Sequence, residues 1–227
     1  MYQKNMKNTH GDFEEKSSKY NRYWKERFEI NRTRVTEIHA KILSIVSRHA
    51  SKGSKIIDLG VGPGHVFKKL QENHDTYGVE ISKKAFELYD FDSSQIKQAD
   101  LEKEIPTFES APNFDFIIAS HIIHHFKKPL SFLKMVNGKL SEDGKILIAT
   151  PNTTFFNHRF RYFFFGQYPK LSPEHINFLT CSEYKKLFKE ANLRIVEITG
   201  LEHYLFLSKK FPSMFSPTLF FVVEKNK

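Results

Sequence analysis

Three histidines lie within five positions of one segment, SHIIHHF, which spans residues 120–126. They are His121, His124 and His125. A histidine can act as a general base, bind a metal ion or fill a packing position, and its pKa near neutrality suits the first role. The spacing HxxHH lacks the glutamate of the zinc motif H-E-x-x-H, and the segment is not part of a long predicted helix. We therefore expect no metal site, which leaves a base or a packing role.

A glycine-rich loop could hold a ligand against the backbone. The segment IIDLGVGPGHV, residues 56–66, contains Gly60, Gly62 and Gly64, which permit a tight turn and close approach of a ligand. The spacing G-x-G-x-G differs from the dinucleotide fingerprint G-x-G-x-x-G. Asp58 precedes the first glycine, and its carboxylate would repel a pyrophosphate but attract an ammonium group. The loop predicts a nucleotide-like ligand that carries a positive charge.

Two further acids follow predicted strands. Glu80 ends the second strand, 20 residues after Gly60, which is the place of a carboxylate that binds ribose hydroxyls. Asp100 ends the third strand, where its side chain could accept a hydrogen bond from an adenine amino group. Together with Asp58, these acids stand at the ends of three successive strands, which indicates a single binding site.

Strand-like and helix-like segments alternate along the chain and would position these residues. Apolar, β-branched runs predict strands at 55–59, 76–80, 95–100, 114–120, 145–150, 193–200 and 218–225. The run FDFIIAS at 114–120 is the most apolar, so we expect it to be central. Thr180 and Glu183 form a capping box that opens a helix, and a 3.6-residue period predicts another helix from about Tyr20 to Arg48. This alternation predicts a parallel sheet that has helices on both faces and binds ligands at the carboxyl ends of its strands.

The motifs, in this order, resemble those of the class I S-adenosylmethionine-dependent methyltransferases. Within that family the chain is similar to the small-molecule group that includes the ubiquinone-pathway O-methyltransferases. The resemblance covers about residues 30–225 and is carried by IIDLGVGPG, VEIS, QADLE, FDFIIASHIIHHFKKP, DGKILIATPN and HINFLTCSEYKKLFKEANL. It implies an α/β, Rossmann-like three-layer sandwich whose seven-stranded sheet is mostly parallel with an antiparallel last strand. We expect an N-terminal helical cap at 1–50 and a methyltransferase domain at 51–227.

The resemblance also implies S-adenosylmethionine as cofactor and S-adenosylhomocysteine as product. In the family the glycine motif wraps the methionine part, the VEIS acid binds the ribose and the QADLE residues meet the adenine. The corresponding cofactor-binding residues here are Asp58, Gly60, Gly62, Gly64, Glu80, Ile81, Asp100, Leu101 and Ser120. Arg34, in the segment INRTR, matches an arginine that pairs with the cofactor carboxylate in those enzymes, although a solvated arginine fits the short match equally well.

Two histidines are candidates for the base. His121 falls one residue past the fourth predicted strand, beside the transferable methyl group in this family, where it would bind substrate, act as the base or form a wall of the pocket. His175 lies in a segment that covers the substrate cavity in relatives, and it could instead fix the entry to the following helix. His125 aligns with a structural histidine of the family. His124 is expected to point to solvent or toward the N-terminal helices.

An aromatic insertion occupies about residues 151–178. Phe156, Phe160, Phe163 and Phe164 recur on one helical face, with Arg159 and Arg161 interleaved. This helix could pack its Phe face on the domain. Alternatively it could form a lid in which Phe156, Arg159 and Arg161 bind the substrate. The apolar and basic segment 204–217 adds to it, and together they suggest a bulky, lipid-linked or anionic acceptor and permit peripheral membrane contact.

The formal net charge of +9 in 227 residues comes mainly from the N-terminal quarter, since residues 1–55 contain 13 Lys+Arg and 6 Asp+Glu. Such charge fits a solvated basic helical segment or a segment that attracts an anionic substrate or surface, and it also suggests a nucleic-acid methyltransferase as an alternative. Against this, the residues ASHI stand where amino-methylating enzymes of nucleic acids have the motif [DNS]-P-P-[YFW]. Enzymes that methylate carbon 5 of a base need a nucleophilic cysteine, and the single cysteine here, Cys181, takes a helix-cap position instead. A non-catalytic partner subunit that binds S-adenosylmethionine is a further alternative.

The lack of a signal peptide or a 20-residue apolar run predicts a cytoplasmic protein. Methyl transfer to oxygen, less often nitrogen, of a small molecule is the leading hypothesis.

Overall fold

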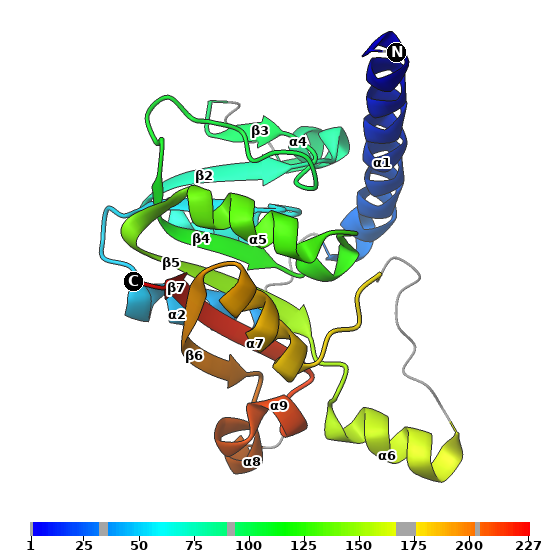
Figure 1. The fold of residues 1–227 in the computed structure, drawn as a ribbon, viewed down its shortest axis with the longest axis vertical. Coiled ribbons are helices and arrows are strands. Elements are labelled where there is room, and N and C mark those ends of the chain that lie inside the picture. Colours follow the sequence, from blue (N-terminus) through cyan, green and yellow to red (C-terminus); the bar gives the residue numbers. More distant parts are fainter. Residues whose placement is uncertain (1, 32–35, 90–93, 167–175, 203–204) are drawn as a thin grey trace.

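The structure is a computed structural model that describes residues 2–31, 36–89, 94–166, 176–202 and 205–227. Within these residues one sheet of seven strands has the order β3-β2-β1-β4-β5-β7-β6 (Figure 1). The strands are β1 (Lys55–Leu59), β2 (Asp75–Glu80), β3 (Ile96–Gln98), β4 (Phe114–Ser120), β5 (Leu140–Pro151), β6 (Leu193–Gly200) and β7 (Thr218–Lys225).

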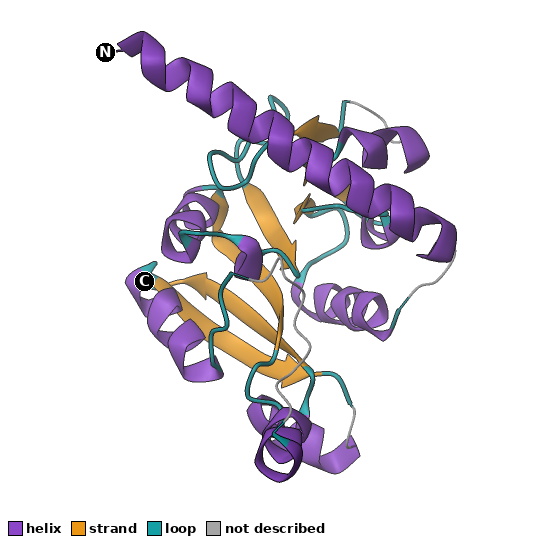
Figure 2. Ribbon diagram, turned by 90° about the vertical axis from the view of Figure 1, so that its right-hand side faces the viewer, coloured by secondary structure: helices purple, strands orange, loops and turns teal. Residues whose placement is uncertain are grey.

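The first five strands run parallel, and β7 is antiparallel to both of its neighbours, β5 and β6. This confirms the predicted sheet, including its antiparallel last strand. The apolar strand β4 is the middle one of the seven, as its sequence predicted. All five parallel strands therefore end at one edge of the sheet, which faces the viewer in Figure 2.

Helices cover both faces of the sheet and complete a three-layer sandwich (Figure 2). The helices of the described residues are α1 (Tyr2–Asn31), α2 (Glu37–His49), α3 (His65–Leu70), α4 (Lys83–Tyr89), α5 (Pro129–Gly138), α6 (Phe156–Phe165), α7 (Cys181–Glu190), α8 (Leu205–Lys210) and α9 (Pro212–Phe215), with a short 3-10 turn, η1 (Ile123–His125). Not all of them lie on the sheet, since α1 and α6 extend beyond it (Figure 1).

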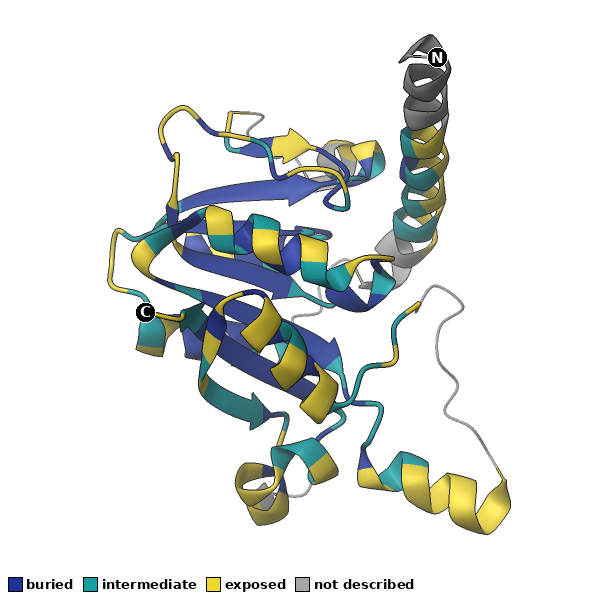
Figure 3. Ribbon diagram, viewed as in Figure 1, coloured by how far each residue is buried: buried dark blue, intermediate teal, exposed yellow. Residues whose placement is uncertain are grey.

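Alternate residues of the strands serve the two faces, because successive strand side chains point in opposite directions. On one face, Phe132 of α5 and Tyr184 of α7 pack in a cluster with Ile117 of β4. On the other face, Ile45 of α2 packs with Phe116, the preceding residue of the same strand. Figure 3 shows the result: the inner strands of the sheet are buried, whereas the edge strands β3 and β6 are partly exposed.

The predicted single helix from Tyr20 to Arg48 is wrong. The chain forms two helices instead, and α1 already begins at Tyr2. A capping box starts α2: the Thr36 hydroxyl accepts a hydrogen bond from His39 N at 3.4 Å, and His39 Nδ1 accepts one from Thr36 N at 3.2 Å. The 3.6-residue period continues across this start, so the apolar pattern alone did not reveal it.

Asn152 fixes the end of β5 and the segments beyond it. Its buried amide group donates to the carbonyl oxygens of Ser213 and Ser216, at 2.9 and 2.7 Å, and its oxygen accepts from Thr154 N at 3.0 Å. Its backbone N donates to Pro217 O at 2.8 Å. One side chain thus ties the start of the aromatic insertion to α9 and the entry of β7.

We expect Asn152→Ala to destabilise the fold by about 1–3 kcal/mol, because it leaves buried backbone groups without partners. Urea unfolding followed by circular dichroism measures this loss. Asn226→Ala, at an exposed position, is the matched control and should stay within about 0.5 kcal/mol of the wild type. Equal midpoints for the two variants would show that Asn152 does not carry this junction.

Candidate functional site

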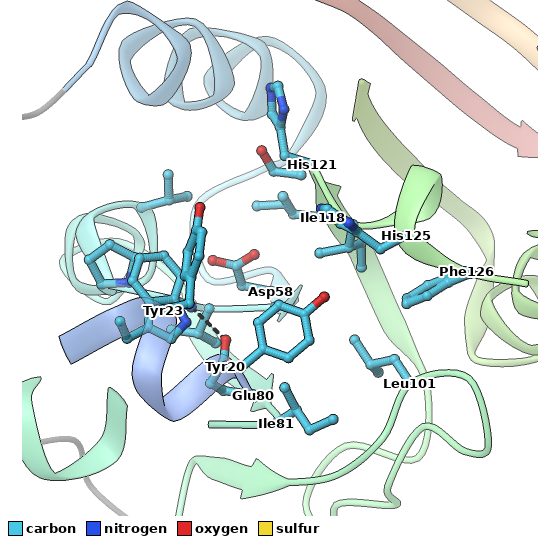
Figure 4. A pocket seen from close by; sticks show the side chains of 18 of the residues that line it. Tyr20, Tyr23, Asp58, Glu80, Ile81, Leu101, Ile118, His121, His125 and Phe126 are labelled. Atoms are coloured by element: carbon cyan, nitrogen blue, oxygen red, sulfur yellow. Dashed lines mark hydrogen bonds between the residues drawn. The ribbon is translucent and has the colours of Figure 1, made fainter. Parts of the chain in front are cut away.

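A cavity of about 500 Å³ lies at the carboxyl ends of β1, β2 and β4, beneath α1 (Figure 4). Most of the residues that the sequence singled out are brought together here. Those lining the cavity are Asp58, Gly60, Gly62, Glu80, Ile81, Asp100, Leu101, Ser120 and His121.

Other predicted residues lie elsewhere. Gly64 ends the glycine turn as the N-terminal cap of α3, without lining the cavity. Phe156, Arg159 and Arg161 belong to α6 and do not line it either. The proposed cofactor ligand Arg34 and the proposed base His175 fall outside the described residues.

The glycine turn needs its glycines for two physical reasons. Gly60 and Gly62 have φ angles of 79° and 53°, a region that other residues rarely adopt. A Cβ atom on Gly60 would lie 2.6 Å from Ile122 Cγ2, and one on Gly62 would lie 2.7 Å from Cζ2 of Trp24, which belongs to α1. The backbone of the turn is therefore in close contact with its surroundings, and any side chain would intrude on the cavity wall.

Glu80 holds the turn from the neighbouring strand. Its buried carboxyl group accepts hydrogen bonds from Gly62 N and Ser82 N, both at 2.9 Å. Burial nevertheless raises the pKa of Glu80, and these backbone hydrogen bonds only partly oppose the shift. The acid that ends β2 thus sets the position of the loop that follows β1.

Asp58 is a second buried acid in the same cavity, and Figure 4 shows it between the α1 tyrosines, Tyr20 and Tyr23, and His121. Burial, and to a smaller extent the charge of Glu80, raises the pKa of Asp58 to about 8. A cationic ligand in the cavity would stabilise the charged form of this carboxyl group. The site is therefore suited to a ligand that carries a positive charge.

Asp100 forms an ion pair with a residue of α1. Lys16 of α1 places its Nζ 2.9 Å from Asp100 Oδ2 and 2.6 Å from Glu102 Oε2. Sequence patterns did not reveal this contribution of α1, nor that of Trp24, which also lines the cavity. The segment YNRYW lies at the start of the helix predicted from Tyr20, and its helical period did not show which face covers a cavity.

Two of the three histidines of the segment SHIIHHF line the cavity, and the third is buried beside them. His121 lines the cavity with an unusual φ of 56°, and its N donates to Ala149 O at 2.9 Å. His125 also lines the cavity. His124 is 2% exposed, so the expectation that it faces solvent is wrong. It is buried because its carbonyl oxygen accepts from Ile176 N and Asn177 N, at 2.9 and 3.0 Å, which covers the turn.

Two further histidines were not identified from the sequence. His39 of α2 and His65 of α3 line the cavity with ring centroids 5.2 Å apart. Burial, followed by the proximity of His65, lowers the pKa of His39 and favours its neutral form. The packing of α2 on α3 brings them together, and no local spacing encodes this. Among the described residues, no group of three or more His, Cys, Asp and Glu side chains is arranged to hold a metal ion.

The insertion helix α6 does not pack its aromatic face on the domain as one alternative supposed. Phe163 and Phe164 are 81% and 61% exposed, and no residue of α6 is buried. Of the residues that the structure describes, none belongs to a helix with the length and apolar content required to cross a bilayer.

Comparisons with known proteins show which family the chain is similar to. A family model described as "Methyltransferase domain" matches residues 23–198. The chain is 23% identical over 187 residues to the ubiquinone biosynthesis O-methyltransferase of Acinetobacter baylyi, covering 77% of this chain and 78% of the relative. It is 24% identical over 169 residues to the enzyme of the same name from Coxiella burnetii, covering 70% and 71%.

The fold is also similar to solved structures. A S-adenosylmethionine-dependent methyltransferase from Clostridium acetobutylicum superposes with a TM-score of 0.64 at 13% identity, over 92% of this chain and 99% of that chain. At this identity the likeness concerns the fold alone.

We expect Gly62→Ala to weaken binding of S-adenosylhomocysteine by more than about tenfold, or 1.4 kcal/mol, because the new Cβ atom displaces Trp24. Titration calorimetry measures the affinity. Gly53→Ala is the matched control, because Gly53 has a similar positive φ of 82° but no atom within 4 Å of the added Cβ. The control should lose about 1 kcal/mol of stability and no affinity. An unchanged affinity of Gly62→Ala for S-adenosylhomocysteine would show that the glycine turn is not part of the binding site.

We expect Asp58→Asn to flatten the pH dependence of stability in the ligand-free protein. The folded carboxyl group keeps its proton up to about pH 8, whereas the unfolded one releases it near pH 3.8. The associated stability is complete below that lower value and is lost as the pH rises to about 8, by about 1.4 kcal/mol per unit. Urea unfolding at several pH values measures the slope, with the exposed Glu109→Gln as control. Equal slopes for the wild type and Asp58→Asn would contradict the assignment.

Proposed function

Because the chain belongs to the methyltransferase-domain family, we propose that it transfers a methyl group from S-adenosylmethionine to an oxygen atom of a small, partly apolar acceptor. The protein is an enzyme, and S-adenosylmethionine is its cofactor. When bound, the cofactor supplies a methyl group on a positively charged sulfur. Transfer is an in-line displacement that depends mainly on the positioning of the two reactants.

The residues of the cavity fit this cofactor. Gly60 and Gly62 hold the loop in a positive-φ turn that packs closely against Ile122 and Trp24, so this wall of the cavity is formed by a compact glycine turn. Asp58, with a pKa raised to about 8, offers a carboxyl group whose charge a cationic ligand would stabilise. Glu80, Asp100 and their neighbours then line the part of the cavity proposed for the ribose and the adenine.

The observation that carries the choice of an oxygen acceptor is the presence of several histidines in the same cavity as these acids. A hydroxyl acceptor must lose its proton during transfer, and a neutral imidazole is suited to accept it. His121 stands at the end of β4 and is the candidate base, with His39 as the second choice because burial keeps it neutral. A carboxylate acceptor would need no base. The names of the curated relatives, which are O-methyltransferases, support oxygen over nitrogen.

The walls of the cavity suggest the character of the acceptor. Tyr20, Tyr23 and Phe126 provide aromatic surface, which favours a flat and partly apolar molecule. Lys19 and Lys127 are exposed and also line the cavity, so an anionic group on the acceptor would meet two cations. We therefore extend the proposal to bulky, lipid-linked or anionic acceptors.

A panel of acceptors tests the proposal directly. The full chain is incubated with S-adenosylmethionine and with phenols, aliphatic alcohols, carboxylic acids, amines or RNA, and release of S-adenosylhomocysteine is measured. Mass spectrometry and NMR of the product then identify the methylated atom. Turnover restricted to amines or to RNA would overturn the proposal, and cofactor binding without turnover on any acceptor would favour a non-catalytic subunit.

We expect His121→Ala to lower kcat on a hydroxyl acceptor by about 10²–10⁴-fold, since a positioned base contributes this much to proton transfer. The loss should shrink as the pH rises and the acceptor ionises unaided. Affinity for S-adenosylhomocysteine should stay within about threefold, or 0.7 kcal/mol. Initial rates across a pH series measure the effect.

His74→Ala, outside the cavity, is the control and should leave kcat unchanged. His39→Ala distinguishes the two candidate bases: if it shows the large, pH-dependent loss and His121→Ala does not, the roles assigned here are reversed. If neither variant shows the loss, His175→Ala tests the remaining predicted base, and a flat result there would indicate an acceptor that needs none.

A further inference from the structure

Exposed aromatic side chains gather on one part of the surface, formed by α6, α8 and the start of α9. We refer to these three helices as the aromatic platform. Its most exposed apolar residues are Phe160, Phe163, Phe164, Phe165, Phe206 and Phe211. Phe163 of α6 is 81% exposed and Phe206 of α8 is 69% exposed. Exposed apolar side chains that gather on one surface in this way usually mark an interaction site.

The platform is a connected structure rather than a set of separate loops. The rings of Phe156 on α6 and Phe215 on α9 lie 5.7 Å apart. The helices α8 and α9 are joined by a hydrogen bond from Phe211 N to Leu207 O at 2.8 Å and by one from Ser208 Oγ to Phe215 O at 2.9 Å. Figure 1 shows the three helices at the end of the molecule opposite to α1.

Basic side chains accompany the aromatic ones. Arg159 and Arg161 lie on α6, Lys209 and Lys210 lie on α8, and the sequences of the three helices contain no Asp or Glu. Lys210 Nζ is 5.9 Å from the ring centroid of Phe206 and 5.5 Å from that of Phe211. Lys209 pairs with Glu202, just before α8, at 3.4 Å. The platform therefore carries both exposed apolar rings and basic side chains, and Lys210 lies beside two of those rings.

We propose that the aromatic platform docks on the surface of an anionic lipid bilayer. Phenylalanine rings of interfacial helices enter the boundary between headgroups and acyl chains, while neighbouring Lys and Arg side chains meet lipid phosphates. The platform has both parts. A second copy of this chain is a poorer occupant, because docking two platforms face to face would bring their four cations against four others.

The location of the platform has a consequence for the catalytic cavity, which rests on the proposed function. The helix α6 follows β5, a parallel strand whose carboxyl end lies at the same edge of the sheet as the cavity. Figure 2 looks onto this edge, with α1 across one end and the platform at the other. Docking would hold this edge of the sheet beside the bilayer, with the platform nearer the lipid than the cavity, which lies beneath α1 (Figure 2).

Flotation of the full chain with vesicles tests the docking without any catalytic step. Vesicles of equal parts phosphatidylcholine and phosphatidylglycerol should bind the protein at low ionic strength, and vesicles of phosphatidylcholine alone should bind it less. Phe163→Ser and Phe206→Ser should each weaken the partition by about tenfold, since each removes one inserted ring. Arg159→Gln and Arg161→Gln should each weaken it by about fivefold.

The matched control is Lys185→Gln combined with Lys186→Gln, two exposed lysines of α7 outside the platform, which should leave the partition nearly unchanged. Thermal unfolding should show that the two serine variants remain folded, because both rings are exposed. Two observations would each overturn the proposal: no flotation with the anionic vesicles, or flotation that neither serine variant alters. A wild-type dimer that Phe163→Ser dissociates, without vesicle binding, would assign the platform to a second copy instead.

Discussion

Two buried carboxyl groups at the ends of adjacent parallel strands are the constraint on which the site depends. Asp58 and Glu80 share a low-dielectric region, and burial raises the pKa of both. Glu80 is partly compensated by hydrogen bonds from Gly62 N and Ser82 N. These bonds pull the glycine loop against β2, so the geometry of the loop follows from the need to satisfy this acid. The fold keeps an electrostatic cost in its ligand-free state that a cationic ligand would relieve.

The two N-terminal helices are held by different forces. The helix α2 buries Ile42, Ile45 and Val46 against the sheet and is part of the core. The helix α1 is attached largely by polar contacts at the cavity, such as the Lys16 ion pairs and the hydrogen bond from Ser17 Oγ to Ile81 O at 3.0 Å. Polar contacts of this kind contribute less net free energy than buried apolar area, so the described contacts of α1 hold it less firmly than the core residues hold α2.

The sequence predicted the features that local patterns encode, but it did not predict the contacts that depend on how distant helices pack together. The alternation of strands and helices, the central position of β4 and the capping box of Thr180 and Glu183 follow from periodicity and from short-range hydrogen bonds. The acids at strand ends could be placed in one cavity because parallel strands end at one edge. His39 and His65 could not, since the packing of α2 on α3 brings them together. Trp24 shared the helical period of core residues, and that period does not tell a core face from a face that covers a ligand cavity.

The helical spacing of the Phe residues in α6 is ambiguous in the same way, because it fits both a core-facing helix and an exposed one. The structure shows that the helix is exposed. Phe156, Phe160, Phe163 and Phe164 have the spacing of a core-facing helix, yet α6 buries none of its residues. The domain core is complete without them, because α5 and α7 already cover that face of the sheet. Among the described residues, the outermost rings, Phe163 and Phe164, keep most of their surface exposed, so hydrophobic burial contributes little to their stability there. The bilayer contact proposed above would bury these rings and bring the neighbouring basic side chains against anionic headgroups.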